Sequence, residues 1–202
     1  PAGGPAQARA AILNGADAIY LGAKQFSARS GAQNFDEGEL GRTVDDCHGR
    51  GVKVYLALNT LLRQSELPRA LEVVRQAHRA GIDALIVQDL GLVSLVRQAF
   101  PDLPLHGSTQ MSIHSPAGAR QLARLGFSRA ILARALSLEE IAAIAREGAL
   151  ELEVFIHGAL CMSVSGQCLM SAVIGGRSGN RGDCAGTWRQ PPSPAGPATA
   201  TI

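Results

Sequence analysis

Short aliphatic runs recur along the chain, and several of them follow a stretch with helical periodicity. The stretches Ala6–Asn14 and Leu67–Ala80 each lead to a glycine and then to such a run, the second of them to Ala84–Val87. A run that is apolar on both faces is typical of a parallel strand buried under helices. We count six predicted strands, which start near residues 18, 53, 84, 105, 129 and 152.

Glycines and capping residues mark the ends of the predicted helices. Gly15, Gly81 and Gly126 each stand just before an aliphatic run, where a left-handed residue commonly ends a helix. Ser137, with Glu140 three residues later, predicts a helix start with a capping box. Two further N-caps are expected, at Asp36 and Ser65.

The spacing of the predicted strands indicates the fold class. Strands about 20 to 35 residues apart match the repeated strand–helix units of an α/β barrel or an open doubly wound sheet. No G-x-G-x-x-G pattern follows the first strand, which disfavours dinucleotide binding. Because both ends of the chain look cut, we expect a fragment of an eight-stranded barrel. It would comprise a partial α/β barrel of the (βα)8 TIM type over residues 1–185 and a proline-rich, disordered tail over residues 186–202.

Composition and charge narrow the class of protein. Of the 202 residues, 46% are hydrophobic and 18% are charged, which is typical of a globular chain. The net charge of +2 is too small to indicate nucleic-acid binding by itself. No apolar run approaches the roughly 20 residues of a membrane span, so we expect a cytoplasmic protein without one. The sequence leaves the oligomeric state open.

Polar residues stand near the ends of the predicted strands, where α/β barrels carry their functional groups. Five of them are candidate catalytic residues: Arg29, Asn59, His106, Gln110 and His157. Each could by itself be an ordinary strand cap or turn residue. Their recurrence at successive strand ends favours a functional mouth without indicating a reaction.

Three cysteines late in the chain are the sharper signal. Cys161, Cys168 and Cys184 lie in a glycine-rich stretch, and three thiolates on such a loop can surround zinc or an iron–sulfur cluster. The C-x2-C spacing of zinc ribbons is absent, and by spacing alone unpaired thiols are as good an explanation as a metal site. Cys47 lies in a predicted amphipathic helix and is interpreted as structural.

Familiar hydrolase motifs are missing from the sequence. There is neither an H-E-x-x-H zinc motif nor a G-x-S-x-G nucleophile elbow. Cys161 and His157 could form a protease-like pair, but nothing in the sequence orients them. The stretch 175–182 resembles a phosphate loop only in its glycine content, although its two arginines could meet an RNA phosphate.

The segment from Glu153 to Ser171 resembles a signature of the collagenase-like peptidase family U32. The pattern E-x-F-x-x-G-[small]-[aliphatic]-C-x4-G-x-C-x-[aliphatic]-S would place Cys161 and Cys168 as its two cysteines. Supporting matches extend over residues 1–185, and the stretch 175–182 is most similar to the branch that modifies ribosomal RNA. These matches are Pro1–Gly3, Ala18–Gly22, Phe26–Arg29, Leu58–Thr60, Val87–Asp89 and Ser108–Met111.

The resemblance implies two kinds of activity. The family is named for proteolysis, but several members are iron–sulfur proteins that hydroxylate an RNA base or a quinone precursor without molecular oxygen. In those members four cysteines hold a 4Fe-4S cluster, of which the first three correspond to Cys161, Cys168 and Cys184 and the fourth lies further downstream. Prephenate is the co-substrate that the RNA-modifying members imply.

We therefore expect an iron–sulfur-dependent hydroxylase that acts on ribosomal or transfer RNA. A collagenase-like peptidase is the first alternative. Because the match to the family stops after Ala185, the chain lacks the fourth cysteine, and an inactive fragment or scaffold is the second alternative.

Overall fold

The computed structural model describes residues 1–158, 161 and 163–184. Six parallel strands form one sheet in which spatial order follows chain order. They are β1 (Ala18–Gly22), β2 (Lys53–Leu58), β3 (Ala84–Val87), β4 (Leu105–Gly107), β5 (Arg129–Ile131) and β6 (Glu151–Glu153). The predicted starting points of all six strands are confirmed. The predicted tail, 186–202, lies outside the described residues.

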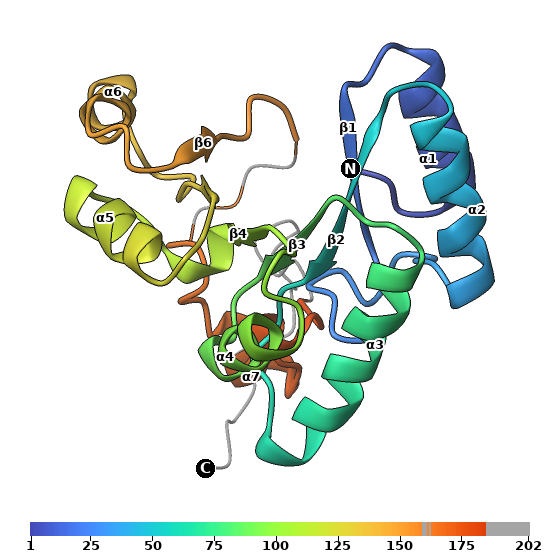
Figure 1. Cartoon of the computed structure of the whole chain (residues 1–202). Helices are drawn as coiled ribbons and strands as arrows, with labels where there is room; N and C mark the ends of the chain where they lie inside the picture. The colour runs from blue at the N-terminus through green and yellow to red at the C-terminus, as the bar shows by residue number, and fades with distance from the viewer. Residues whose placement is uncertain (159–160, 162, 185–202) are drawn as a thin grey trace.

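Helices connect the strands and cover one face of the sheet. The main helices are α1 (Pro5–Leu13), α2 (Glu37–His48), α3 (Leu67–Arg79), α4 (Leu90–Ala99), α5 (Pro116–Arg124) and α6 (Leu138–Arg146). A short α7 (Met170–Gly175) and three 3-10 turns, η1 (Gln64–Glu66), η2 (Thr109–Met111) and η3 (Gly179–Arg181), complete the described part of the chain. The sheet curls with the helices on its outside (Figure 1), so the fold is a partial TIM-type barrel.

The main core lies between the convex face of the sheet and the helices. Leu56, Leu85 and Leu105 point to this side and are fully buried, because alternate residues of a strand face the same way. The concave face carries a second, smaller apolar cluster that includes Tyr55 and Ile86. The two faces together explain why the central strand β3 is apolar and buried at every position.

Local signals fix the helix ends. Asp36 and Ser137 form the N-terminal caps of α2 and α6, as predicted. The capping box predicted at Ser137 is confirmed, and Asp36 forms a second one with Glu39. The cap predicted at Ser65 is wrong: this residue lies inside η1, and the N-cap of α3 is Glu66. The predicted helix-ending glycines are confirmed by their left-handed backbone, with φ of 80° at Gly15, 86° at Gly81 and 84° at Gly126.

The last strand is shorter than its sequence suggests. The sequence predicts a strand over Leu152–His157, but β6 ends at Glu153, and Ile156 is 94% exposed. The reason is the length of its neighbour: β5 has three residues, which pair one to one with Glu151–Glu153. At the opposite edge, Ala2 pairs in parallel with Leu21 of β1. None of the described helices is long and apolar enough to cross a membrane.

Candidate active site at the mouth of the half-barrel

Asn59 joins three strand ends at the carboxyl edge of the sheet. It follows β2, accepts a hydrogen bond from the Ala28 N–H at 3.0 Å, and donates one to Ser108 Oγ at 3.1 Å. Ala28 belongs to the loop after β1, and Ser108 follows β4. The prediction that the residues after successive strands converge is therefore confirmed for Asn59.

Gln110 lies in η2, directly beyond β4. Its N–H donates to Ser108 Oγ at 3.2 Å, and its carbonyl accepts from Gln88 Nε2 at 3.3 Å. The other amide atom of Gln88, Oε1, is buried without a hydrogen-bond partner among the described residues. Asn59, Gln88, Ser108 and Gln110 thus form one polar network across the ends of β2, β3 and β4.

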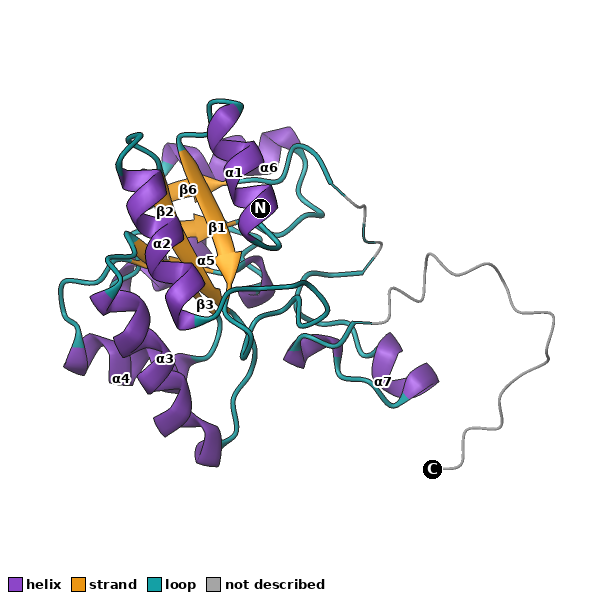
Figure 2. Cartoon of the chain, turned by 90° about the vertical axis from the view of Figure 1, so that its right-hand side faces the viewer, coloured by secondary structure: helices purple, strands orange, loops and turns teal. Residues whose placement is uncertain are grey.

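The cysteine segment, residues 161–184, docks onto this network at two glycines. Gly166 has a φ of 76°, and a Cβ added to it would lie 2.8 Å from the carbonyl carbon of Gln110 and closer still to its oxygen. Gly182 has a φ of 90°, and its added Cβ would overlap the carbonyl of Ser27 in the same way. Only glycine accommodates both the left-handed backbone and this close approach. Figure 2 shows α7, within the segment, beyond the carboxyl end of β1.

Ser165 is a second anchor of the cysteine segment. Its side chain is buried, and its Oγ accepts hydrogen bonds from the Arg134 N–H at 3.3 Å and from Arg134 Nε at 3.1 Å. The Ser165 carbonyl accepts from Ser112 Oγ, and its hydroxyl contacts Thr109 Oγ1 at 3.4 Å. These contacts fix the first part of the segment over the ends of β4 and β5.

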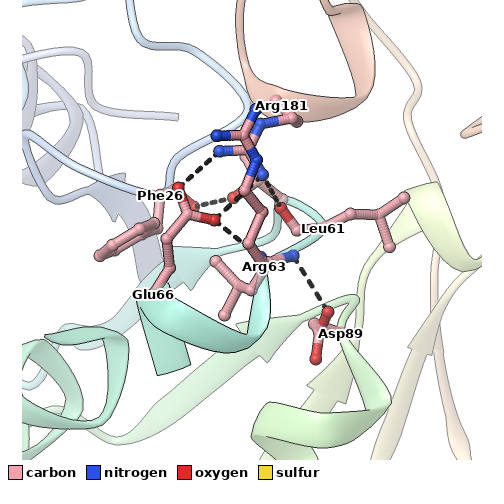
Figure 3. Close-up of polar contacts among 8 residues, drawn as sticks. Phe26, Leu61, Arg63, Glu66, Asp89 and Arg181 are labelled. Atoms are coloured by element: carbon pink, nitrogen blue, oxygen red, sulfur yellow. Dashed lines mark hydrogen bonds and ion pairs between the residues drawn. The ribbon is translucent and has the colours of Figure 1, made fainter. Parts of the chain in front are cut away.

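An ion pair holds the last part of the segment against the loop after β2 (Figure 3). Arg181 donates to the two carboxylate oxygens of Glu66 at 2.6 and 3.1 Å and to the Leu61 carbonyl at 3.0 Å. The Arg63 N–H also donates to Glu66, at 2.7 Å. The arginine first and this N–H second lower the pKa of Glu66 to about 2, so the carboxylate stays charged.

The three late cysteines all lie in the docked segment. Gly179 stands between two of them: its added Cβ would lie 3.8 Å from the Cβ of Cys184 and 3.9 Å from the carbonyl oxygen of Cys168. Hydrogen bonds from Ser163 and from the Met170 N–H lower the pKa of the Cys168 thiol, which favours the thiolate. Cys161 is half-buried earlier in the segment. Within the described part of the chain, no three potential ligands form a metal-binding group.

The donor set nevertheless fits a soft metal centre in its chemistry. Thiolates are the ligands of zinc and of iron–sulfur clusters, and a lowered thiol pKa favours metal binding. Cys47, in contrast, is fully buried in α2, and burial raises the pKa of its thiol. The structural role predicted for Cys47 is confirmed.

His106 does not belong to the polar network at the strand ends, the mouth network. Its side chain is on the concave face of the sheet, with its ring 4.8 Å from that of Tyr55, whose other neighbour is the guanidinium of Arg129. Burial, assisted by the Arg129 charge, lowers the pKa of His106 to about 4, and its Nδ1 has no hydrogen-bond partner among the described residues. Grouping His106 with Gln110 was wrong, because its place inside β4 turns its side chain to the concave face.

The two remaining candidates also stand apart from the mouth network. The Arg29 side chain is exposed, and its charge acts on Tyr20, whose pKa burial raises. His157 is exposed beyond β6, four residues after the strand ends. The expectation that His157 closes a strand is wrong.

Sequence reasoning missed the residues that fasten the cysteine segment. Ser165 and Arg181 carry most of these contacts, yet the bond between Arg181 and Glu66 spans 115 positions of the chain. The usable signal was glycine: Gly166 and Gly182 stand within the cysteine-rich stretch, where their left-handed backbone permits close contact.

Together, fold and site define a partial α/β barrel whose strand ends carry a polar network beneath the cysteine segment. Comparison with known families refines this class. The model of Peptidase family U32 matches residues 3–192, and the chain belongs to that family.

Curated relatives carry names of RNA-modifying proteins. The 23S rRNA 5-hydroxycytidine C2501 synthase of Escherichia coli is 43% identical over 95% of this chain and 29% of its own length. The tRNA hydroxylation protein P of Escherichia coli is 37% identical over 94% of this chain and 42% of its own length. The chain thus spans less than half of either relative.

A solved structure supports the fold. The U32 peptidase Mk0906 superposes with a TM-score of 0.56 at 21% identity, over 68% of this chain and 60% of its own.

Proposed function

We propose that this chain contributes the reactive mouth of an RNA-base hydroxylase. The observation that carries the proposal is the cysteine segment, which glycine contacts, Ser165 and Arg181 hold over the polar ends of the strands. The names of the rRNA and tRNA relatives support RNA as the substrate class. Such a substrate would place the protein in the cytoplasm.

We further propose that Cys161, Cys168 and Cys184 ligate a 4Fe-4S cluster. Support comes from the lowered pKa of Cys168 and from the closeness of Cys168 and Cys184 to Gly179. The cluster would supply one-electron transfer next to the mouth. A four-cysteine set would take one further ligand besides these three thiolates.

Hydroxylation sets a condition on the co-substrate. Replacing a base C–H bond by C–OH adds one oxygen atom to the base and removes two electrons from it. The oxygen atom therefore comes from a co-reactant or from water, and the two electrons pass to an organic acceptor; we propose prephenate as the co-substrate. Gln110 carries a side-chain amide in η2, beyond β4, that could position a base or a carboxylate. Asn59 would hold the mouth in shape, because its two amide atoms are hydrogen-bonded to the Ala28 N–H and to Ser108 Oγ.

Peptidase activity is the competing function, because the family is named for it. An experiment on cellular RNA separates the two functions.

Ribosomal and transfer RNA would be isolated from cells that lack the gene and from cells that express wild-type, Cys168→Ala or Cys47→Ala protein. Mass spectrometry of the nucleosides should reveal an oxygen-added base with the wild type and with Cys47→Ala, and none with Cys168→Ala. Iron-independent cleavage of gelatin by the purified protein, without any oxygen-added nucleoside, would favour the peptidase instead.

A further inference from the structure

A cleft of about 380 Å³ opens beside the docked end of the cysteine segment. Gln25 and Thr60 line it from the loops that follow β1 and β2, and Arg181 closes it from η3. Ser65 and Arg69 come from the start of α3 and the turn before it. The cleft therefore lies at the carboxyl ends of the first two strands, on the same edge of the sheet as the mouth network.

The charge balance of the cleft is positive. Among the described residues that line it, Glu66 is the only acid, and its charge is matched by the two-pronged ion pair with Arg181. Arg69 also lines the cleft and has an exposed side chain, and within the described part of the chain it forms no ion pair or hydrogen bond. One uncompensated guanidinium therefore remains.

Neutral hydrogen-bond donors accompany this guanidinium. The hydroxyl of Ser65 and the amide of Gln25 line the cleft, and neither side chain is hydrogen-bonded to another described residue. The Thr60 hydroxyl is not available in the same way, because it donates to the Phe26 carbonyl at 3.2 Å. A guanidinium, a hydroxyl and an amide around one hollow match the several acceptor oxygens of a tetrahedral oxyanion.

We propose that this cleft binds a phosphate group of the RNA backbone, held mainly by Arg69. The inference rests on the proposed function for its choice of RNA, whereas the affinity for phosphate follows from the cleft alone. A phosphate bound here would fix the strand beside the cysteine segment, because Arg181 belongs to both. Contacts of this kind set the position and register of a nucleic acid without reading its sequence.

The test compares Arg69→Gln with Arg79→Gln, a matched control on the same helix. Arg79 is exposed, has no ion pair within the described residues, and lies about 15 Å further along α3 at 1.5 Å per residue. Titration with inorganic phosphate, followed by NMR, should shift the amides of Ser65 and Arg69 in the wild type and in Arg79→Gln. Arg69→Gln should abolish the shift.

Binding of a single-stranded RNA oligonucleotide, measured against salt, supplies the second arm. Loss of one phosphate contact should reduce the slope of log K against log salt by about 0.7 in Arg69→Gln and leave it unchanged in Arg79→Gln. The wild type could bind RNA, show no amide shift with phosphate, and have the same salt slope as Arg69→Gln. That result would overturn the phosphate site in the cleft and leave the proposed function intact. A phosphate shift without any RNA binding would contradict the RNA substrate and reassign the cleft to free phosphate.

Discussion

Gly166→Ala should undock the cysteine segment without unfolding the sheet. Alanine at a φ of 76° costs about 1–2 kcal/mol because its Cβ crowds the backbone. That Cβ would also lie 2.8 Å from the carbonyl carbon of Gln110, and relieving such an overlap costs about 1–3 kcal/mol more. The docked state should therefore lose about 2–5 kcal/mol relative to the undocked one.

Gly176→Ala is the matched control for backbone strain. Gly176 lies in the same segment with a φ of 63°, but no other atom comes within 4 Å of its added Cβ. This variant should lose only the strain of about 1–2 kcal/mol. The difference between the two variants, about 1–3 kcal/mol, corresponds to a roughly 5- to 150-fold difference in the population of the undocked state.

Native-state hydrogen exchange measures this population directly. The Ser30 N–H donates to the Gly182 carbonyl at 3.2 Å, so its exchange reports on docking. We expect the Ser30 amide to exchange roughly 5- to 150-fold faster in Gly166→Ala than in Gly176→Ala. The amides of β3 should keep their wild-type exchange rates. Equal rates at Ser30 in the two variants would refute the argument that the contact with Gln110 holds the segment in place.

Two further predictions concern single side chains. The pKa of His106 is about 4 in the folded protein, against an ordinary value of 6.5. As pH falls, the imidazole is therefore protonated in the unfolded chain before it is protonated in the folded one. The free energy of unfolding should fall by up to about 3 kcal/mol between pH 6.5 and 4, and this contribution is fully present above pH 6.5. Urea denaturation at pH 7 and pH 4.5 gives the free energy of unfolding, which should change less with pH in His106→Leu than in the wild type. The control is His114→Gln, which alters an exposed histidine and should behave like the wild type. The same change in all three proteins would contradict the argument that burial lowers the pKa of His106. In the metal-free native protein, Cys47 should react with a thiol reagent much more slowly than Cys168. Cys47 is fully buried, which raises the pKa of its thiol, whereas the pKa of the Cys168 thiol is lowered. If peptide mapping finds Cys47 labelled first, its structural role is wrong.

The sheet was predictable because its strands are continuous apolar runs with helix-ending glycines before them. Ala84–Val87, buried at every position, is the clearest example. The end of β6 was not predictable in this way: the apolar residues after Glu153 suggest a longer strand, but β5 offers only three residues for pairing. Strand length depends on the neighbour, which the local pattern does not contain.

The candidate site was predictable only where a simple topological rule applies. Residues directly after parallel strands meet at one edge, which located Asn59 and Gln110. His106 is inside its strand, so alternation turns it to the concave face instead. The contact of Glu66 with Arg181 depends on how a distant loop folds back, and no local pattern encodes it.

We propose that the mouth under the cysteine segment hydroxylates an RNA base. The most direct test of this proposal is an anaerobic reaction of the iron-reconstituted protein with RNA and prephenate, followed by mass spectrometry of the nucleosides. We expect a base that carries one additional oxygen atom. It should form only when protein, iron and prephenate are all present, and it should be lost in Cys168→Ala. Unmodified RNA from iron-loaded wild-type protein that binds the RNA would contradict the proposal.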